Sequence, residues 1–195
     1  NLAPGLAMFG SVFMALFAGM LLSKDRTSSF LTRLFTSPMT ATDFILGYTF
    51  PMIIMTIVQA SITLLVAGIF GLDINVNIIL AIIITALTSL LFIGTGLFFG
   101  SLLNEKAVGG VCGALLTNIA GWLSGVFIPI DLIGGAFKTI TNILPFYHSV
   151  EAIKLSLNGD FSNILPHLSI VMGYTGIIFV FAIITFNRKM AGEKA

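Results

Sequence analysis

Charged side chains are scarce in this sequence of 195 residues, of which only 9 % are Asp, Glu, Lys or Arg. An average soluble domain has about 25 % of them, so this chain has too few charges to cover a water-exposed surface. Cysteine is scarcer still, because Cys112 is the single one. It cannot form an intrachain disulfide, and we interpret it as a small packing residue. The composition therefore argues against an ordinary soluble domain.

Motifs for nucleotide binding, catalysis and metal binding are also missing from the sequence. The sequence has no G-x-x-x-x-G-K-[ST], so it has no Walker loop for ATP. No nucleophile–base pair is visible, and neither His148 nor His167 has a Cys, Asp or second His at the spacing of metal ligands. The sequence therefore predicts no enzymatic activity, no metal site and no cofactor in this chain. The two histidines are expected to form hydrogen bonds at the membrane interface.

Hydrophobic residues, in contrast, make up 57 % of the chain, and the mean hydropathy is +1.08. About 20 helical residues cross a hydrocarbon core roughly 30 Å thick. Five runs without any Asp, Glu, Lys or Arg are long enough: Leu2–Leu22, Phe44–Leu72, Ile74–Leu103, Ala107–Ile130 and Phe161–Phe186. The sequence thus predicts an all-α integral membrane protein, a polytopic helical bundle with five spans. The absence of charge within the runs disfavours an ion-coupled or proton-coupled carrier.

The basic residues predict the orientation of the bundle. Five spans place the two termini on opposite sides of the membrane. One side carries seven basic residues: Lys24, Arg26, Arg33, Lys106, Arg188, Lys189 and Lys194. The other side carries Lys138 and Lys154. Because the basic side is normally the inner one, we expect a multi-pass protein of a prokaryotic plasma membrane, with a cytoplasmic C-terminus and a further span upstream of Asn1.

The polar segment 23–43 has a structural pattern of its own. It can form a short helix with apolar side chains along one side: Phe30, Leu31, Leu34 and Phe35. Pro38 ends that helix, and Thr40 with Asp43 forms a capping-box pattern that opens the next span. From the residues alone, the apolar side is covered either by a protein partner or by lipid headgroups.

The segment before the last apolar run is too apolar for a simple loop. Leu132–Leu144 and Ser149–Leu157 each have the pattern of a short helix, and Pro145 separates them. Glu151 and Lys154 lie at i and i+3, where their side chains can meet. Such helices either dip into the outer leaflet or form an interfacial cap that stabilises the bundle.

Small and polar residues within the spans predict packing. Gly96-x-x-x-Gly100 and Gly121-x-x-x-Gly125 allow close helix approach, which we expect within one subunit in preference to a dimer interface. Four polar residues also lie within spans: Gln59, Ser61, Thr117 and Asn118. They either meet a substrate or form hydrogen bonds between helices, and the second is the expectation.

Two sequence stretches carry a family resemblance. A charged cluster followed by Leu31-Thr32-Arg33-Leu34-Phe35-Thr36-Ser37-Pro38 resembles the first cytoplasmic loop of type-2 ATP-binding-cassette (ABC) exporter permeases. Ser124-Gly125-Val126-Phe127-Ile128-Pro129-Ile130-Asp131, continued by Leu144-Pro145-Phe146-Tyr147 and Val150-Glu151-Ala152-Ile153, resembles the end of the family's fifth span and its external re-entrant segment. The family usually has an acidic residue and a glycine in the charged cluster, whereas this chain reads Lys24-Asp25-Arg26-Thr27.

The resemblance implies one ABC type-2 transmembrane domain over residues 1–195 that lacks the first of six spans. It implies a coupling helix that docks on a separate ATPase subunit, which binds ATP-Mg, through Arg26, Phe30, Leu31, Arg33 and Leu34. It also implies an external gate that includes Pro129, Asp131, Pro145 and Glu151.

The function implied is that of the permease subunit of an ATP-driven exporter, paired with a second permease subunit. An uncharged path suits an amphipathic, drug-like or lipid-linked substrate. The alternatives are a non-transport scaffold or accessory subunit of a lipid-processing complex, and a self-sufficient secondary carrier.

Overall fold

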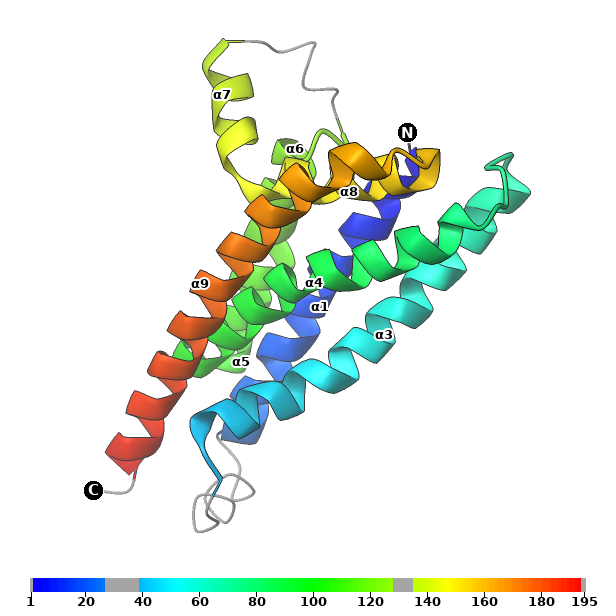
Figure 1. The fold of residues 1–195 in the computed structure, drawn as a ribbon. Coiled ribbons are helices and arrows are strands. Elements are labelled where there is room, and N and C mark those ends of the chain that lie inside the picture. Colours follow the sequence, from blue (N-terminus) through cyan, green and yellow to red (C-terminus); the bar gives the residue numbers. More distant parts are fainter. Residues whose placement is uncertain (1, 27–38, 128–134, 194–195) are drawn as a thin grey trace.

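The structure is a computed structural model that describes residues 2–26, 39–127 and 135–193 (Figure 1). These residues form helices, and no strand occurs among them. In chain order the helices are α1 (Leu2–Arg26), α3 (Ala41–Ile69), α4 (Asn77–Leu102), α5 (Glu105–Val108), the π-helix η1 (Gly109–Leu116), α6 (Thr117–Leu123), α7 (Gly135–Ile143), α8 (Pro145–Asn158) and α9 (Phe161–Glu193).

Five helical stretches of the described chain are long and apolar enough to cross a membrane. They are α1, α3, α4, the continuous run α5–η1–α6, and α9 up to Lys189. The described part of the chain starts and ends at opposite ends of the bundle (Figure 1). The prediction of an all-α polytopic bundle with five spans is therefore confirmed.

The helices α1 and α4 form the centre of this bundle. In both, 56 % of the most apolar window is buried, against 22 % in α3 and 17 % in α9. The core includes Met8 and Val12 of α1 packed with Leu91 and Phe92 of α4. The outer helices α3 and α9 lie along this pair (Figure 1) and turn much of their surface to the surroundings.

Glycine lets the two central helices touch through their backbones. A Cβ on Gly96 would lie 2.0 Å from the carbonyl oxygen of Ala15, and one on Gly100 would lie 2.5 Å from that of Gly19. No side chain fits at such a separation, so glycine is required at the crossing. The first small-residue motif thus packs within the subunit, as predicted.

The second small-residue motif does not pack two helices together. Gly125 lies beyond the end of α6 and has a φ of 77°, in the left-handed region that favours glycine. Gly121 contacts the ring of Phe127 on the same stretch of chain, and a Cβ there would lie 2.2 Å from it. The expectation of a helix–helix motif at this place was therefore wrong.

The turns and helix starts follow the sequence closely. Thr40 and Asp43 form the predicted capping box at the start of α3. Asn104 caps α5, since its Oδ1 accepts a hydrogen bond of 2.9 Å from the Ala107 N–H. α8 starts with Pro145, and Gly159 ends it with a φ of 75°. α7 and α8 confirm the two predicted short helices, although Leu132–Gly134 lie outside the described residues.

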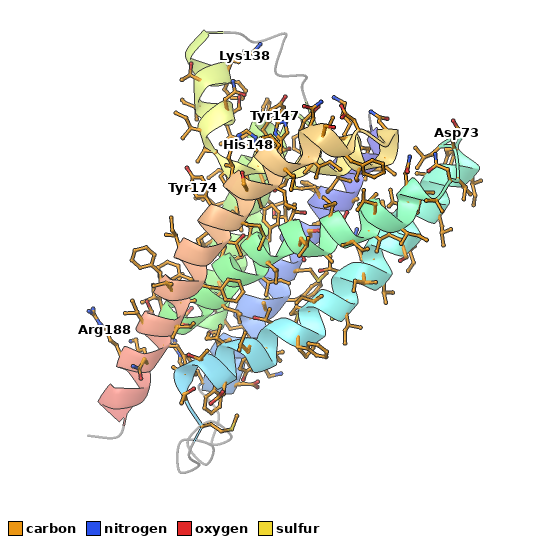
Figure 2. All side chains as sticks on the ribbon, viewed as in Figure 1. Asp73, Lys138, Tyr147, His148, Tyr174 and Arg188 are labelled. Atoms are coloured by element: carbon orange, nitrogen blue, oxygen red, sulfur yellow. The ribbon has the colours of Figure 1, made fainter. Side chains whose placement is uncertain are left out.

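The ends of the bundle differ in charge. One end, here called the basic end, holds the last turn of α1, the start of α5 and the last turns of α9 (Figure 1), with Lys24, Arg26, Lys106, Arg188 and Lys189. The opposite end carries α7 and α8, with Lys138 and Lys154. Figure 2 shows Arg188 and Lys138 at these two ends.

Candidate functional site

The last turn of α1 is fastened to the end of α4 at the basic end. Ser23 Oγ donates a hydrogen bond of 2.8 Å to the carbonyl of Leu103. The Arg26 guanidinium donates to the same carbonyl at 3.0 Å and also to the carbonyl of Ser101. The last carbonyls of a helix lack donors within the helix, and a cation near them is favourable. Arg26 therefore caps α4 although 75 residues separate it from Ser101.

The same turn of α1 is also fastened to α3. Tyr48 donates its hydroxyl hydrogen to Asp25 Oδ2 at 2.8 Å, and this contact is partly buried. We call the whole arrangement the polar clamp, and it consists of Ser23, Asp25, Arg26, Tyr48 and the carbonyl groups of Ser101 and Leu103. It joins three helices at the point where α1 ends and where the chain between α4 and α5 turns.

The capping box fixes the other helix end nearby. The Thr40 N–H donates to Asp43 Oδ2 at 2.8 Å, and the Asp43 N–H donates to Thr40 Oγ1 at 3.3 Å. Such a box satisfies two backbone donors that the helix leaves free. The start of α3, directly after residues 27–38 and Met39, is therefore fixed by local hydrogen bonds.

The fourth span departs from regular α-helix. Residues Gly109–Leu116 wind as a π-helix, and Thr117 Oγ1 donates to the carbonyl of Cys112, five residues earlier, at 3.1 Å. Cys112 is fully buried, in accord with its predicted role in packing. π-helical turns inside α-helices are frequently found at functional sites. The three glycines at 109, 110 and 113 are the sequence feature that accompanies this irregularity.

An amide lies on the outer surface of that span. Asn118 is exposed, and its Nδ2 donates to the carbonyl of Ala114 at 2.7 Å on its own helix. Around it the surface is apolar, with Leu115 57 % exposed and Trp122 49 % exposed. A polar side chain on a lipid-facing surface is unfavourable, so this surface suits a protein partner or a solvated path better than acyl chains.

The polar residues within the spans do not join helices as predicted. Gln59 Nε2 donates to Thr63 Oγ1 at 3.1 Å, and Ser61 Oγ donates to the carbonyl of Ile57 at 2.7 Å. Thr117 and Asn118 likewise bond within their own span. The expectation of interhelical hydrogen bonds was therefore wrong, because Ser, Thr and Asn reach the carbonyl one turn back on their own helix.

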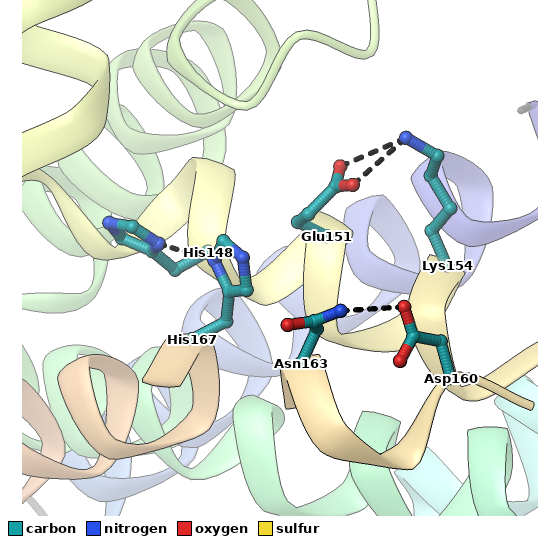
Figure 3. Close-up of polar contacts among 6 residues, drawn as sticks. All are labelled: His148, Glu151, Lys154, Asp160, Asn163 and His167. Carbon is teal, nitrogen blue, oxygen red and sulfur yellow. Dashed lines mark hydrogen bonds and ion pairs between the residues drawn. The ribbon is translucent and has the colours of Figure 1, made fainter. Parts of the chain in front are cut away.

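At the opposite end, two histidines join α8 to α9. His148 Nδ1 lies 2.7 Å from His167 Nδ1, and His148 Nε2 lies 2.8 Å from the carbonyl oxygen of Asn142 in α7 (Figure 3 shows the histidine pair). A carbonyl only accepts, so His148 Nε2 carries a hydrogen. In the neutral pair His148 Nδ1 then accepts and His167 Nδ1 donates. The histidines thus form hydrogen bonds, as predicted, and are each other's partner, which their separation in sequence did not indicate.

Charged and aromatic groups surround this pair. Glu151 accepts from Lys154 Nζ at 2.9 Å, which confirms the predicted contact (Figure 3), and both charges act on His167. The Tyr147 ring centroid lies 6.2 Å from that of His167. No cluster of three or more His, Cys, Asp or Glu side chains occurs among the described residues. The pair is therefore a hydrogen-bonded link between helices.

The predicted site residues divide between these two ends. Arg26 belongs to the polar clamp, whereas the other four predicted coupling residues lie outside the described residues: Phe30, Leu31, Arg33 and Leu34. Pro145 and Glu151 lie in α8, which packs on α9 and α4. Pro129 and Asp131 lie outside the described residues.

The family model for "ABC-2 type transporter" matches residues 1–157 of the chain. The chain belongs to this family. Nodulation protein J of Rhizobium meliloti (strain 1021) is 25 % identical over 126 residues. That alignment covers 64 % of this chain and 48 % of the nodulation protein, so the chain spans about half the length of the curated relative it matches. No solved structure matches the chain significantly.

The family match includes residues from both ends of the bundle. The matched region contains the helices from α1 to α7 and nearly all of α8, and thus the polar clamp, the π-helix and His148. The ABC-2 family is a membrane component of transporters and is not itself catalytic. The resemblance found in the sequence is therefore confirmed, and the chain is a membrane-embedded ABC transporter component.

Proposed function

We propose that this ABC-2 chain is the permease subunit of an ATP-driven exporter whose ATPase is a separate subunit. Family membership over residues 1–157 carries the proposal. The sequence supports a permease and an ATPase on separate subunits, because this sequence has apolar spans but no Walker loop. ATP-Mg is then bound by the partner, and this chain supplies the path through the membrane.

The basic end faces the cytoplasm in this proposal. An excess of Lys and Arg marks the inner side of membrane proteins, and five of the described basic residues lie at this end. The ATPase docks there on residues 27–38, with Phe30, Leu31, Arg33 and Leu34 as the contacts. Arg26, directly before that segment in sequence, is itself held at the end of α4 by the carbonyls of Ser101 and Leu103.

The path lies between two permease subunits. The exposed surface of α6 around Asn118 supports its use as the pairing surface, since an amide there gains a partner on association. The uncharged spans favour an amphipathic, drug-like or lipid-linked substrate that leaves the cell. At the outer end α7 and α8 form the gate, and Pro145 and Glu151 belong to it.

The test is capture of the ATPase by the chain. The tagged full-length protein, purified from its own cells, is expected to bring down an ABC ATPase in stoichiometric amount. Leu34→Glu should abolish the capture, because it places a charge in the apolar contact. Ile140→Glu is the matched control, since Ile140 is an exposed apolar residue at the opposite end. A well-folded chain that captures no ATPase would refute the proposal and favour a scaffold or an accessory subunit.

A further inference from the structure

The polar clamp contacts the chain at the turn between the third and fourth spans. Its central acceptor is the carbonyl of Leu103, which receives hydrogen bonds from Ser23 at 2.8 Å and from Arg26 at 3.0 Å. Leu103 and Asn104 are the two residues between α4 and α5. The last turn of α1 is therefore bound directly to the turn from which the irregular span α5–η1–α6 begins.

Next to the polar clamp, α1 and α4 pack so closely that we expect the two helices to move together. Gly19 and Gly100 touch close to the basic end, where a Cβ on Gly100 would lie 2.5 Å from the carbonyl oxygen of Gly19. Interfaces packed so closely do not deform continuously. A displacement of the end of α1 is thus passed on to α4 instead of being absorbed between the two helices.

The fourth span, in contrast, has open space beside two of its glycines. A Cβ added to Gly109 or Gly110 would meet nothing within 4 Å, in contrast to the glycines of α4. The π-helical hydrogen bonds of η1 have an alternative, because the same residues can wind as an ordinary α-helix. A span with two possible windings is the kind of element whose equilibrium a distant site can shift.

We propose that the polar clamp transmits movement of α1 and α3 to the α4–α5 turn and thereby to η1, with Arg26 and Tyr48 as its positioning residues. The inference rests on the proposed function, since the movement is the one driven by the ATPase. Arg26 suits the role because a guanidinium is a rigid fork that reaches two carbonyls at once. Tyr48 suits it because its hydroxyl ties α3 to the same turn of α1.

The chain contains its own reporter of movement in η1. Cys112, the single cysteine, lies in the π-helix and is fully buried. A change in the winding of η1 alters the access of a thiol reagent to it. The complex of the full chain with its captured ATPase is placed in lipid nanodiscs, and the rate of Cys112 modification by N-ethylmaleimide is followed by mass spectrometry, with and without ATP-Mg and vanadate.

We expect ATP-Mg with vanadate to raise the modification rate of Cys112 in the wild type. Arg26→Lys and Tyr48→Phe should each lower this increase about fivefold, the effect of losing one net hydrogen bond. ATPase capture and the rate without nucleotide should not change. Arg188→Gln and Tyr174→Phe are the matched controls, because Arg188 is an exposed cation at the basic end and the Tyr174 hydroxyl donates at the opposite end.

The outcomes separate this inference from the proposed function. If the wild type captures no ATPase, the proposed function fails before the clamp is tested. If the ATPase is captured but nucleotide leaves Cys112 unchanged, or if both clamp variants respond like the wild type, the transmission through the clamp is refuted. Variants whose thermal stability falls with capture lost would show a merely structural clamp and would also refute it.

Discussion

The crossing of α1 and α4 makes a sharp prediction for Gly96→Ala. The new Cβ would lie 2.0 Å from the carbonyl oxygen of Ala15, whereas ordinary contact begins at 3.4 Å, so the helices must separate by about 1.4 Å. Overpacking costs about 1–3 kcal/mol in general. The obstacle here is backbone that has no other rotamer, so we expect a loss near the upper limit. For a chain of this length, that loss lowers Tm by about 6–12 °C.

The assay is thermal unfolding of the purified chain in lipid nanodiscs, followed by size-exclusion fluorescence. Gly173→Ala and Gly176→Ala in α9 are the matched controls, because a Cβ at either position meets nothing within 4 Å. Alanine is a better helix former than glycine by about 0.5–1 kcal/mol, so both controls should be stable or slightly stabilised. A Gly96→Ala protein as stable as these controls would refute the close backbone contact.

Two further predictions concern the histidine pair and the surface of α6. Lowering the pH until both imidazoles are charged should release α8 from α9. A single added proton still leaves one hydrogen between the two Nδ1 atoms, but two added protons leave two donors and two positive charges facing each other. Hydrogen exchange should show faster exchange in α8 at low pH, and His167→Asn should remove the pH dependence. A wild type without any pH dependence would contradict the link. Asn118→Leu should leave the fold of one chain unchanged, because the hydrogen bond that Asn118 makes within the described chain stays in its own span. It should weaken self-association in nanodiscs by about 0.6–2 kcal/mol. Ser61→Leu, which also removes a bond within a helix, is the control, and unchanged association of Asn118→Leu would exclude the α6 surface as the pairing surface.

The spans could be predicted because a bilayer allows few backbone conformations. A backbone in hydrocarbon must satisfy its own hydrogen bonds, so a charge-free run of sufficient length becomes a helix. The ends of α3 and α8 also followed from local chemistry, namely the capping box at Thr40 and the proline at the first position of α8. In each of these places the deciding residues are neighbours in sequence.

The arrangement of the sites could not be predicted in the same way. The histidine pair depends on α8 packing back on α9, and the clamp depends on the ends of α1 and α4 meeting although 77 residues separate Arg26 from Leu103. The π-helix has no sequence rule beyond its glycines. Gly125 was misread because glycine is favoured both at a left-handed residue and where two helices approach closely. Spacing alone does not distinguish these cases.

Glycine therefore occurs in two opposite environments in one bundle, and their positions suggest how the bundle moves. At Gly96 and Gly100 the missing side chain lets backbones touch, which fixes α1 to α4. At Gly109 and Gly110 no neighbouring group lies where a side chain would be, so close packing does not require glycine there. The Leu103 carbonyl, held by the clamp, lies between these two pairs in sequence. In the transmission proposed above, a displacement of the end of α1 therefore moves α1 and α4 together, and the change in winding falls on the span that carries Asn118.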